Sequence, residues 1–149
     1  MLIDVDNAAV PVGSTIWLLD ENVMKQRKIS RLESFKYGFS GIWFTLTTQR
    51  NAQIHTIMGG LVVGVGFLVG LNRVEWAIIT LTMGLVVTLE TLNTALEVAM
   101  DHLAPEIHPQ VKIVKDTAAG AVLLGAITAV IVGLLLLGPP LFDLIFGLL

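Results

Sequence analysis

Three apolar stretches, each long enough to cross a lipid bilayer, constrain this chain more than any other feature. They are IHTIMGGLVVGVGFLVGL at 54–71, the run from Trp76 to about Met100, and TAAGAVLLGAITAVIVGLLLL at 117–137. About 20 apolar residues in a helix span the hydrocarbon of a membrane. Only 14% of the 149 residues are charged and 54% are hydrophobic, unlike the composition of a soluble domain. We therefore expect an all-α integral membrane protein with three transmembrane helices.

The segment at 29–52, before the first span, has a different pattern. Its large apolar residues recur every three or four positions, which is the period of one helix face. They are Leu32, Phe35, Phe39, Ile42, Trp43 and Leu46. Basic residues gather near the start of the segment, so the pattern predicts an amphipathic helix lying in the membrane interface. Residues 1–28 begin with acidic side chains and have no long apolar core, which indicates an N-terminal tail rather than a secretory signal.

The third span is followed by Gly138-Pro139-Pro140. Proline has no amide hydrogen to donate within a helix, so the span is expected to stop here. The last residues, LFDLIFGLL at 141–149, are too few to cross a membrane. Residues 138–149 are therefore predicted to form an apolar C-terminal tail that rests at the membrane surface.

The basic residues predict the orientation of the chain. Arg73 alone lies on one side of the predicted spans, and the other eight lie on the opposite side: Lys25, Arg27, Lys28, Arg31, Lys36, Arg50, Lys112 and Lys115. Basic residues favour the cytoplasmic side, so the N-terminus and the loop at 102–116 of this multi-pass cell-membrane protein are expected to be cytoplasmic. The net charge of −3, without a broad basic face, argues against a nucleic-acid partner. The absence of cysteine excludes thiolate chemistry.

The end of the second span carries an unusual polar stripe, LETLNTALEVAMD at 89–101. A helix turns about 100° per residue, which places five polar side chains on one stripe roughly 100° wide. They are Glu90, Asn93, Thr94, Glu97 and Asp101. Counted from Trp76, Glu90 lies about 21 Å along the helix, at the inner edge of the hydrocarbon. An ionisable group at that depth is costly and indicates a functional site.

The residue types of this stripe suit phosphoryl transfer to a lipid hydroxyl. Glu90, partly removed from water, could act as a general base, and Asn93 could orient Glu90 or a substrate hydroxyl. Glu97, nearer water, could hold Mg²⁺, which prefers carboxylate oxygens and water. Lys115 and Asp116, just before the third span, offer a cation for phosphate and a further acidic ligand. The chain has no G-x-x-x-x-G-K-[ST] phosphate loop.

Two other classes of function remain open at this level. The stripe could act only as interhelical hydrogen-bonding groups in a structural membrane assembly. It could also line a small oligomeric channel or transport subunit. A conduction path needs polar groups through the membrane depth, whereas the run from Trp76 to Leu89 and the whole third span carry no charge.

The polar stripe also resembles a family signature. ETLNTALEVAMD at 90–101 is similar to E-x-x-N-[ST]-A-[IL]-E-x-x-x-D of the prokaryotic diacylglycerol kinase family, which includes the undecaprenol kinases. The resemblance extends to SFKYGFSGI at 34–42, RNAQIH at 50–55 and PEIHPQVKIVKDTAAGAV at 105–122. It implies a homotrimeric membrane lipid kinase whose kinase domain covers 29–137. Its active sites would be shared between neighbouring subunits and would use ATP with Mg²⁺.

The resemblance also implies residue roles. Glu90 would be the catalytic base with Asn93 beside it, and segments 34–46 and 51–55 would shape the access route of the lipid. The nucleotide would be bound by Tyr37, Glu97, Glu106, His108, Lys115 and Asp116. Glu97 would also hold the metal, together with Gln49, where other family members have a glutamate. A neutral amide oxygen lacks the charge attraction of a carboxylate, so weaker metal affinity, or compensation by Asp101 or Asp116, is expected. The form of the matching segments is closer to the undecaprenol kinase branch, but both undecaprenol and diacylglycerol remain possible acceptors.

Overall fold

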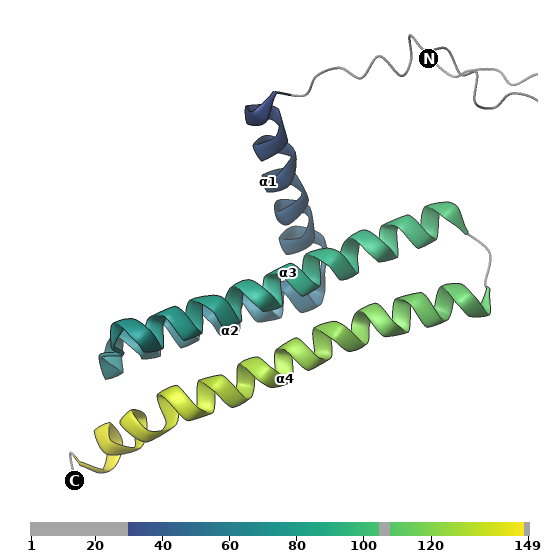
Figure 1. The fold of residues 1–149 in the computed structure, drawn as a ribbon. Coiled ribbons are helices and arrows are strands. Elements are labelled where there is room, and N and C mark those ends of the chain that lie inside the picture. The colour runs from purple at the N-terminus through teal and green to yellow at the C-terminus, as the bar shows by residue number, and fades with distance from the viewer. Residues whose placement is uncertain (1–29, 105–107, 148–149) are drawn as a thin grey trace, which may run out of the picture. The chain divides into compact units, whose positions relative to one another are not determined.

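The described part of the computed structural model, residues 30–104 and 108–147, is helical and contains no strand. Its four helices are α1 (Arg31–Thr48), α2 (Arg50–Val69), α3 (Arg73–Leu103) and α4 (Pro109–Phe146) (Figure 1). The last three are long and apolar enough to cross a membrane, which confirms the predicted fold class. The predicted tail at 1–28 and Glu106 lie outside the described residues. The chain divides into two compact units, Met1–Lys36 and Tyr37–Leu149, and the packing below concerns the second.

The predicted interfacial helix at 29–52 is shorter than expected. It ends at Thr48, and Arg50 already starts the first spanning helix. Between them Gln49 has an extended backbone, with φ −95° and ψ 119°. The hydroxyls of Thr47 and Thr48 donate to the carbonyls of Trp43 and Phe44, at 2.8 and 2.7 Å. Such bonds from a side chain to the preceding turn bend a helix slightly. Thr56 and Thr91 make the same bond within unbroken helices, so these bonds accompany the break and do not account for it alone.

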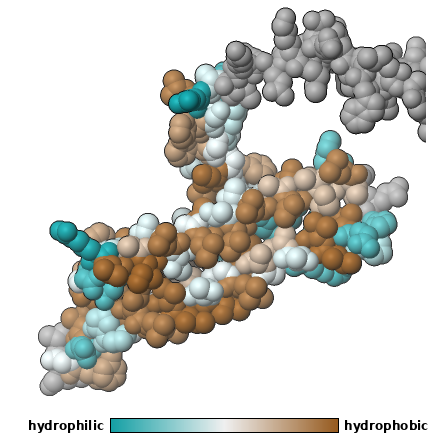
Figure 2. All heavy atoms as spheres, in the orientation of Figure 1, coloured by the Kyte–Doolittle hydropathy of each residue, from teal (hydrophilic) through white to brown (hydrophobic). Residues whose placement is uncertain are grey.

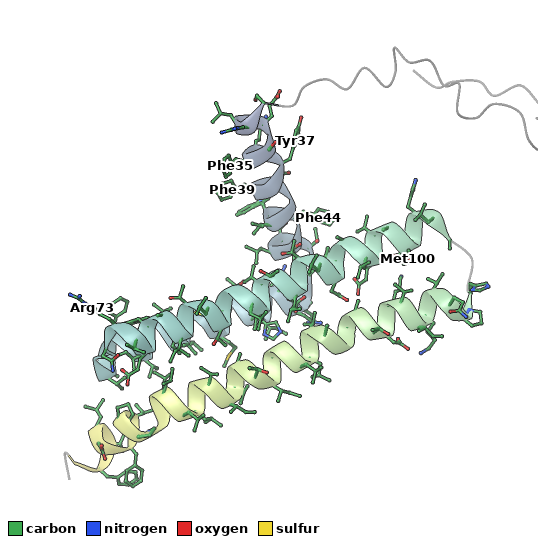
Figure 3. All side chains as sticks on the ribbon, in the orientation of Figure 1. Phe35, Tyr37, Phe39, Phe44, Arg73 and Met100 are labelled. Atoms are coloured by element: carbon green, nitrogen blue, oxygen red, sulfur yellow. The ribbon has the colours of Figure 1, made fainter. Side chains whose placement is uncertain are left out.

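Helix α1 leaves its large apolar side chains uncovered within the chain. Leu32, Phe39 and Trp43 are 82%, 70% and 70% exposed. Tyr37 is also exposed, and Figure 3 shows it on the side of α1 opposite Phe39. This arrangement matches the amphipathic pattern of the sequence.

A tight turn folds α3 back along α2. Gly70 ends α2 in the left-handed region, with φ 73° and ψ 46°, a conformation that favours glycine. Asn72 then caps α3 and forms a reciprocal capping box with Glu75. Glycines on α2 allow close contact, because a Cβ atom on Gly59 would lie 2.9 Å from Met83 Cε on α3.

Helix α4 packs mainly along α3, and both are longer than α2. With 20, 31 and 38 residues, α2, α3 and α4 measure about 30, 46 and 57 Å. Only α2 matches the hydrocarbon thickness of about 30 Å. In Figure 2 hydrophobic residues cover most of the visible surface of these helices, and hydrophilic ones gather toward their ends. This distribution fits helices whose middle parts face lipid.

Helix α4 is longer than the predicted third span at both ends. Helix α4 begins at Pro109, inside the predicted loop at 102–116, because proline suits the first helical turn and His108 Nδ1 accepts a hydrogen bond from Gln110 N at 3.2 Å. At the other end the helix continues through Pro139 and Pro140 to Phe146. Apolar residues lie on both sides of the prolines, and in lipid an open backbone costs more than a locally disturbed helix. The predicted separate C-terminal tail is therefore helical up to Phe146.

Candidate active site

Helices α3 and α4 extend past the beginning of α2 and form a polar arm there. Contacts between side chains show how the helices are aligned along their length. On α3, Glu90 lies beside His55 of α2. Leu89 and Asp101 of α3 lie beside Gly125 and Lys115 of α4. Since α2 starts five residues before His55, the antiparallel α3 continues beyond it from about residue 95. We define the polar arm as residues 95–103 of α3 and 109–120 of α4. Met100, labelled in Figure 3, lies in its α3 part.

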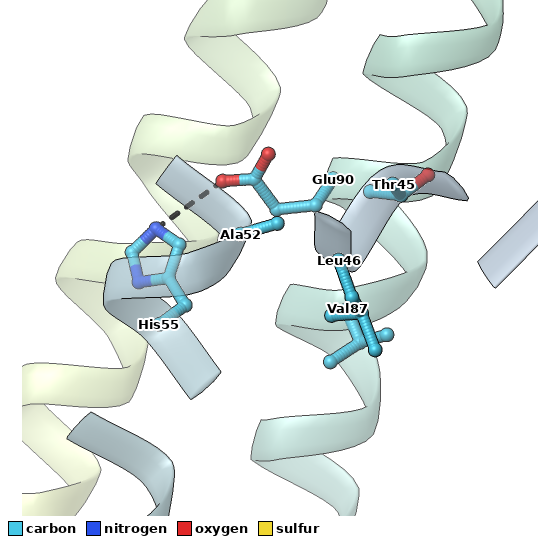
Figure 4. A pocket seen from close by; sticks show the side chains of 6 residues that line it. All are labelled: Thr45, Leu46, Ala52, His55, Val87 and Glu90. Atoms are coloured by element: carbon cyan, nitrogen blue, oxygen red, sulfur yellow. Dashed lines mark ion pairs between the residues drawn. The ribbon is translucent and has the colours of Figure 1, made fainter. Parts of the chain in front are cut away.

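Glu90 lies at the base of this arm, and its side chain is buried, with 3% exposure. It lies about 7.5 Å inside the level at which α2 begins, at 1.5 Å per residue. The sequence predicts that Glu90 lies at the inner edge of the hydrocarbon, and this depth below the start of α2 is compatible with that prediction. The end of α1, the start of α2 and the middle of α3 form a small pocket around Glu90, lined by Thr45, Leu46, Ala52, His55 and Val87 (Figure 4).

A histidine on α2 makes the polar contact with the buried carboxylate. His55 Nε2 lies 3.3 Å from Glu90 Oε1 (Figure 4). The alignment does not meet hydrogen-bond geometry, so Oε1 has no hydrogen-bond partner among the described residues. The carboxylate therefore has a neighbouring nitrogen and retains the capacity to accept another donor.

Asn93 lies between Glu90 and Glu97 on the polar stripe, about one helical turn from each. Its Nδ2 donates to Glu97 Oε1 at 3.0 Å, so the amide orients Glu97, whereas the sequence suggested that it would orient Glu90 or a substrate hydroxyl. Its Oδ1 is buried without a hydrogen-bond partner in the described part of the chain. An unsatisfied buried acceptor costs about 1–3 kcal/mol, so a hydroxyl that reached this oxygen would relieve that cost.

The polar arm holds its charges in two ion pairs. Lys115 on α4 pairs with Asp101 on α3, and Lys112 pairs with Asp116 within α4. Asp101 and Asp116 are mostly exposed. Exposed ion pairs contribute only about 0–1 kcal/mol, so these two pairs add little to the stability of the arm.

The remaining predicted site residues are spread over the chain. Tyr37 is exposed on α1, Gln49 is half-buried between α1 and α2, and His108 caps α4. Within residues 30–104 and 108–147, no three His, Asp or Glu side chains gather closely enough to hold a metal. Mg²⁺ commonly takes one or two carboxylates and completes its shell with water and substrate phosphates. Glu97, half-buried and next to the buried end of the stripe, fits that donor chemistry.

The contact between His55 and Glu90 was not predicted from the sequence, which placed His55 only in a segment that shapes the access route of the lipid. The sequence nevertheless contains a signal for this contact. His55 lies 17 residues before Asn72 and Glu90 lies 18 residues after it. In an antiparallel helix pair joined by a tight turn, residues equally distant from the turn lie side by side. The register therefore follows once the turn is located.

Comparison with known proteins gives consistent matches. Residues 36–137 match the family described as prokaryotic diacylglycerol kinase. The chain is 43% identical over 138 residues to a diacylglycerol kinase of Synechocystis sp. (strain ATCC 27184 / PCC 6803 / Kazusa), covering 92% of this chain and 74% of that protein. It is 44% identical over 109 residues to an undecaprenol kinase of Bacillus subtilis (strain 168), covering 73% of this chain and 89% of that protein.

Proposed function

The chain belongs to the prokaryotic diacylglycerol kinase family and is a membrane lipid kinase, and we propose that it transfers the γ-phosphoryl group of ATP, with Mg²⁺, to the hydroxyl of undecaprenol or diacylglycerol. The observation that carries this proposal is the buried Glu90 carboxylate at the base of the polar arm. A base at this depth can reach the hydroxyl of a lipid that remains in the membrane. The names of the two relatives differ in the lipid, and identities of 43% and 44% favour neither.

Glu90 acts as the general base in this proposal. As the lipid hydroxyl oxygen attacks the γ-phosphorus, Glu90 takes the hydroxyl proton, and the bond between the γ-phosphorus and the ADP oxygen breaks. Asn93 Oδ1, which lacks a partner among the described residues, accepts a hydrogen bond from the hydroxyl before the transfer. General base catalysis of this kind contributes about 10²- to 10⁴-fold in rate.

The polar arm supplies the nucleotide site. Glu97 would hold Mg²⁺, with the amide oxygen of Gln49 as a weaker ligand, and the ion would neutralise charge on the ATP phosphates. Lys115 leaves Asp101 and binds a phosphate. The remaining nucleotide contacts come from the family resemblance: Tyr37, Glu106, His108 and Asp116.

We further propose a homotrimer with shared active sites. Three glycines on the spans, Gly60, Gly64 and Gly84, have no other atom within 4 Å of where a Cβ would stand. Such positions leave room for a neighbouring helix to approach closely. The distribution of basic residues supports a cytoplasmic N-terminus and polar arm, with α1 in the membrane interface. The kinase domain is proposed to cover 29–137.

The channel alternative gains no support from the fold. In the described part of the chain, the buried polar side chains are Thr45, Glu90, Asn93 and Thr94. All four lie near the base of the polar arm, whereas a conduction path needs polar groups along the whole membrane depth.

The proposal is tested with purified protein in lipid vesicles that contain undecaprenol, diacylglycerol or ceramide, supplied with radiolabelled ATP and Mg²⁺. We expect labelled phosphate on undecaprenol or diacylglycerol. If none of the three lipids becomes labelled, the proposed reaction is wrong.

The role of Glu90 is tested separately with Glu90→Gln, which keeps the shape of the side chain and removes the base. Turnover should fall by about 10²- to 10⁴-fold, while ATP binding measured by filtration remains. Near-normal turnover in this variant would rule out Glu90 as the base.

A further inference from the structure

The face of α2 that packs on α3 is built from small residues, with His55 as its large polar exception. Ala52, Gly59 and Gly66 are buried and recur every seven residues, or about two helical turns. His55 follows Ala52 by three positions and precedes Gly59 by four, so it lies on the same face. Because its neighbours on this face are small, α2 lies close to α3 and the imidazole reaches Glu90.

The surroundings of Glu90 leave this carboxylate dependent on His55. Leu46, Ala52 and Val87 are apolar parts of its pocket. Among the described residues, His55 Nε2 at 3.3 Å is the one side-chain nitrogen within ion-pair distance of the carboxylate. A buried carboxylate is strongly destabilised unless a polar partner accompanies it, so the position of the imidazole determines where the carboxylate rests.

From this arrangement we propose that His55 is a positioning residue for Glu90. It holds the carboxylate in the orientation from which Glu90 takes the proton of the lipid hydroxyl, and it does not itself touch the nucleotide. This inference rests on the proposed lipid kinase function. It adds a residue of α2 to the proposed active-site residues of α3. A displacement of about 1 Å at a reacting group can cost about 100-fold in rate, so losing the orientation should mainly lower kcat.

Two substitutions separate orientation from packing. His55→Leu fills a similar space but removes the ring nitrogen that lies 3.3 Å from the carboxylate, and its kcat should fall about 10- to 100-fold. His55→Gln restores an N–H donor on a flexible chain, and its kcat should stay within about tenfold of the wild type and above that of the leucine variant. The KM for ATP should change less than about twofold in both, because the interaction lost is not with the nucleotide.

Arg73→Leu is the control. Arg73 is exposed on the first turn of α3, at the end of the helix opposite the polar arm, and has no role in the proposed reaction, so its loss should leave kcat unchanged. Thermal unfolding of each variant in detergent shows whether it is folded, and the glutamine variant keeps the test valid if the leucine variant is not.

A second measurement asks whether His55 acts through Glu90. In a Glu90→Asp protein the carboxylate is withdrawn by one methylene, so the contact with His55 is already weakened. Adding His55→Leu should then cost less than about threefold in kcat, because residues in contact are not additive. An equal loss in both backgrounds would show that His55 acts elsewhere.

The outcomes distinguish the inference from the function on which it rests. If wild-type protein labels no lipid, the proposed function itself fails. If wild-type protein is active but His55→Leu retains its kcat, or His55→Gln is as slow as His55→Leu, only the positioning role is overturned. A rise in the KM for ATP with unchanged kcat would also overturn it, since His55 would then belong to the nucleotide site.

Discussion

Gly125→Ala is expected to disturb the active site from the opposite side of α3. A Cβ atom at this position of α4 would lie 2.6 Å from Leu89 Cδ1. Carbon atoms pack at about 3.5–4.0 Å, so Leu89 or its helix must shift by about 1 Å. Leu89 directly precedes Glu90. If the Leu89 side chain cannot rotate away, the added methyl group displaces the segment that carries the proposed base.

The magnitude follows from the same contact. Overpacking of this kind costs about 1–3 kcal/mol, partly offset by the better helix propensity of alanine, about 1 kcal/mol relative to glycine. If the shift reaches Glu90, kcat should fall about 10- to 100-fold. The KM for ATP should stay within about twofold, because the proposed nucleotide contacts lie further out on the polar arm.

The assay compares lipid phosphorylation and thermal unfolding in detergent for Gly125→Ala and for Gly133→Ala. Gly133 lies on the same helix, and no other atom is within 4 Å of where its Cβ would stand. Gly133→Ala meets no atom of its own chain, so it should lose less kcat and less thermal stability than Gly125→Ala. The double variant Leu89→Ala/Gly125→Ala removes the clash and should recover part of the lost kcat. Identical behaviour of the two alanine variants would refute this account of the α3–α4 contact.

Two further predictions concern the polar arm and the metal. Asp101→Asn removes the partner that holds Lys115; the KM for ATP should fall by up to about fivefold, since an exposed ion pair contributes at most about 1 kcal/mol. A weaker response to Mg²⁺ in the same titration would instead place Asp101 at the metal. Gln49→Glu restores a charged ligand and should lower the Mg²⁺ concentration needed for half-maximal activity. An unchanged Mg²⁺ titration would show that Gln49 does not face the metal.

The hydropathy of the sequence and its helical periodicity predicted the three spans and the polar stripe, because both depend mainly on local sequence. The three spans were identifiable because about 20 apolar residues have few other stable arrangements. The stripe from Glu90 to Asp101 was identifiable because residues three or four apart share a helix face. The burial of Glu90, Asn93 and Thr94 follows from that placement together with the packing of α3 against its neighbours.

The helix ends were predicted less well, because they depend on competition between local bonds and surroundings. The break at Gln49 is a change of one residue to an extended backbone, which a hydrophobicity pattern does not register. The effect of Pro139 and Pro140 depends on solvent: water would satisfy an interrupted backbone, whereas lipid cannot. A rule taken from soluble helices therefore ended α4 too early.

The unequal helix lengths explain why the site forms where it does. A turn at Gly70 and Asn72 places the end of α2 level with the start of α3, so the extra residues of α3 extend past the other end of α2. The excess of α3 over α2 is eleven residues, or about 16 Å. That length carries Glu97 and Asp101 beyond the start of α2 and leaves Glu90 just within it. The proposed site would thus join the buried Glu90 carboxylate, for a lipid hydroxyl, to the half-buried Glu97 and the exposed Asp101, for a nucleotide, along one face of one helix.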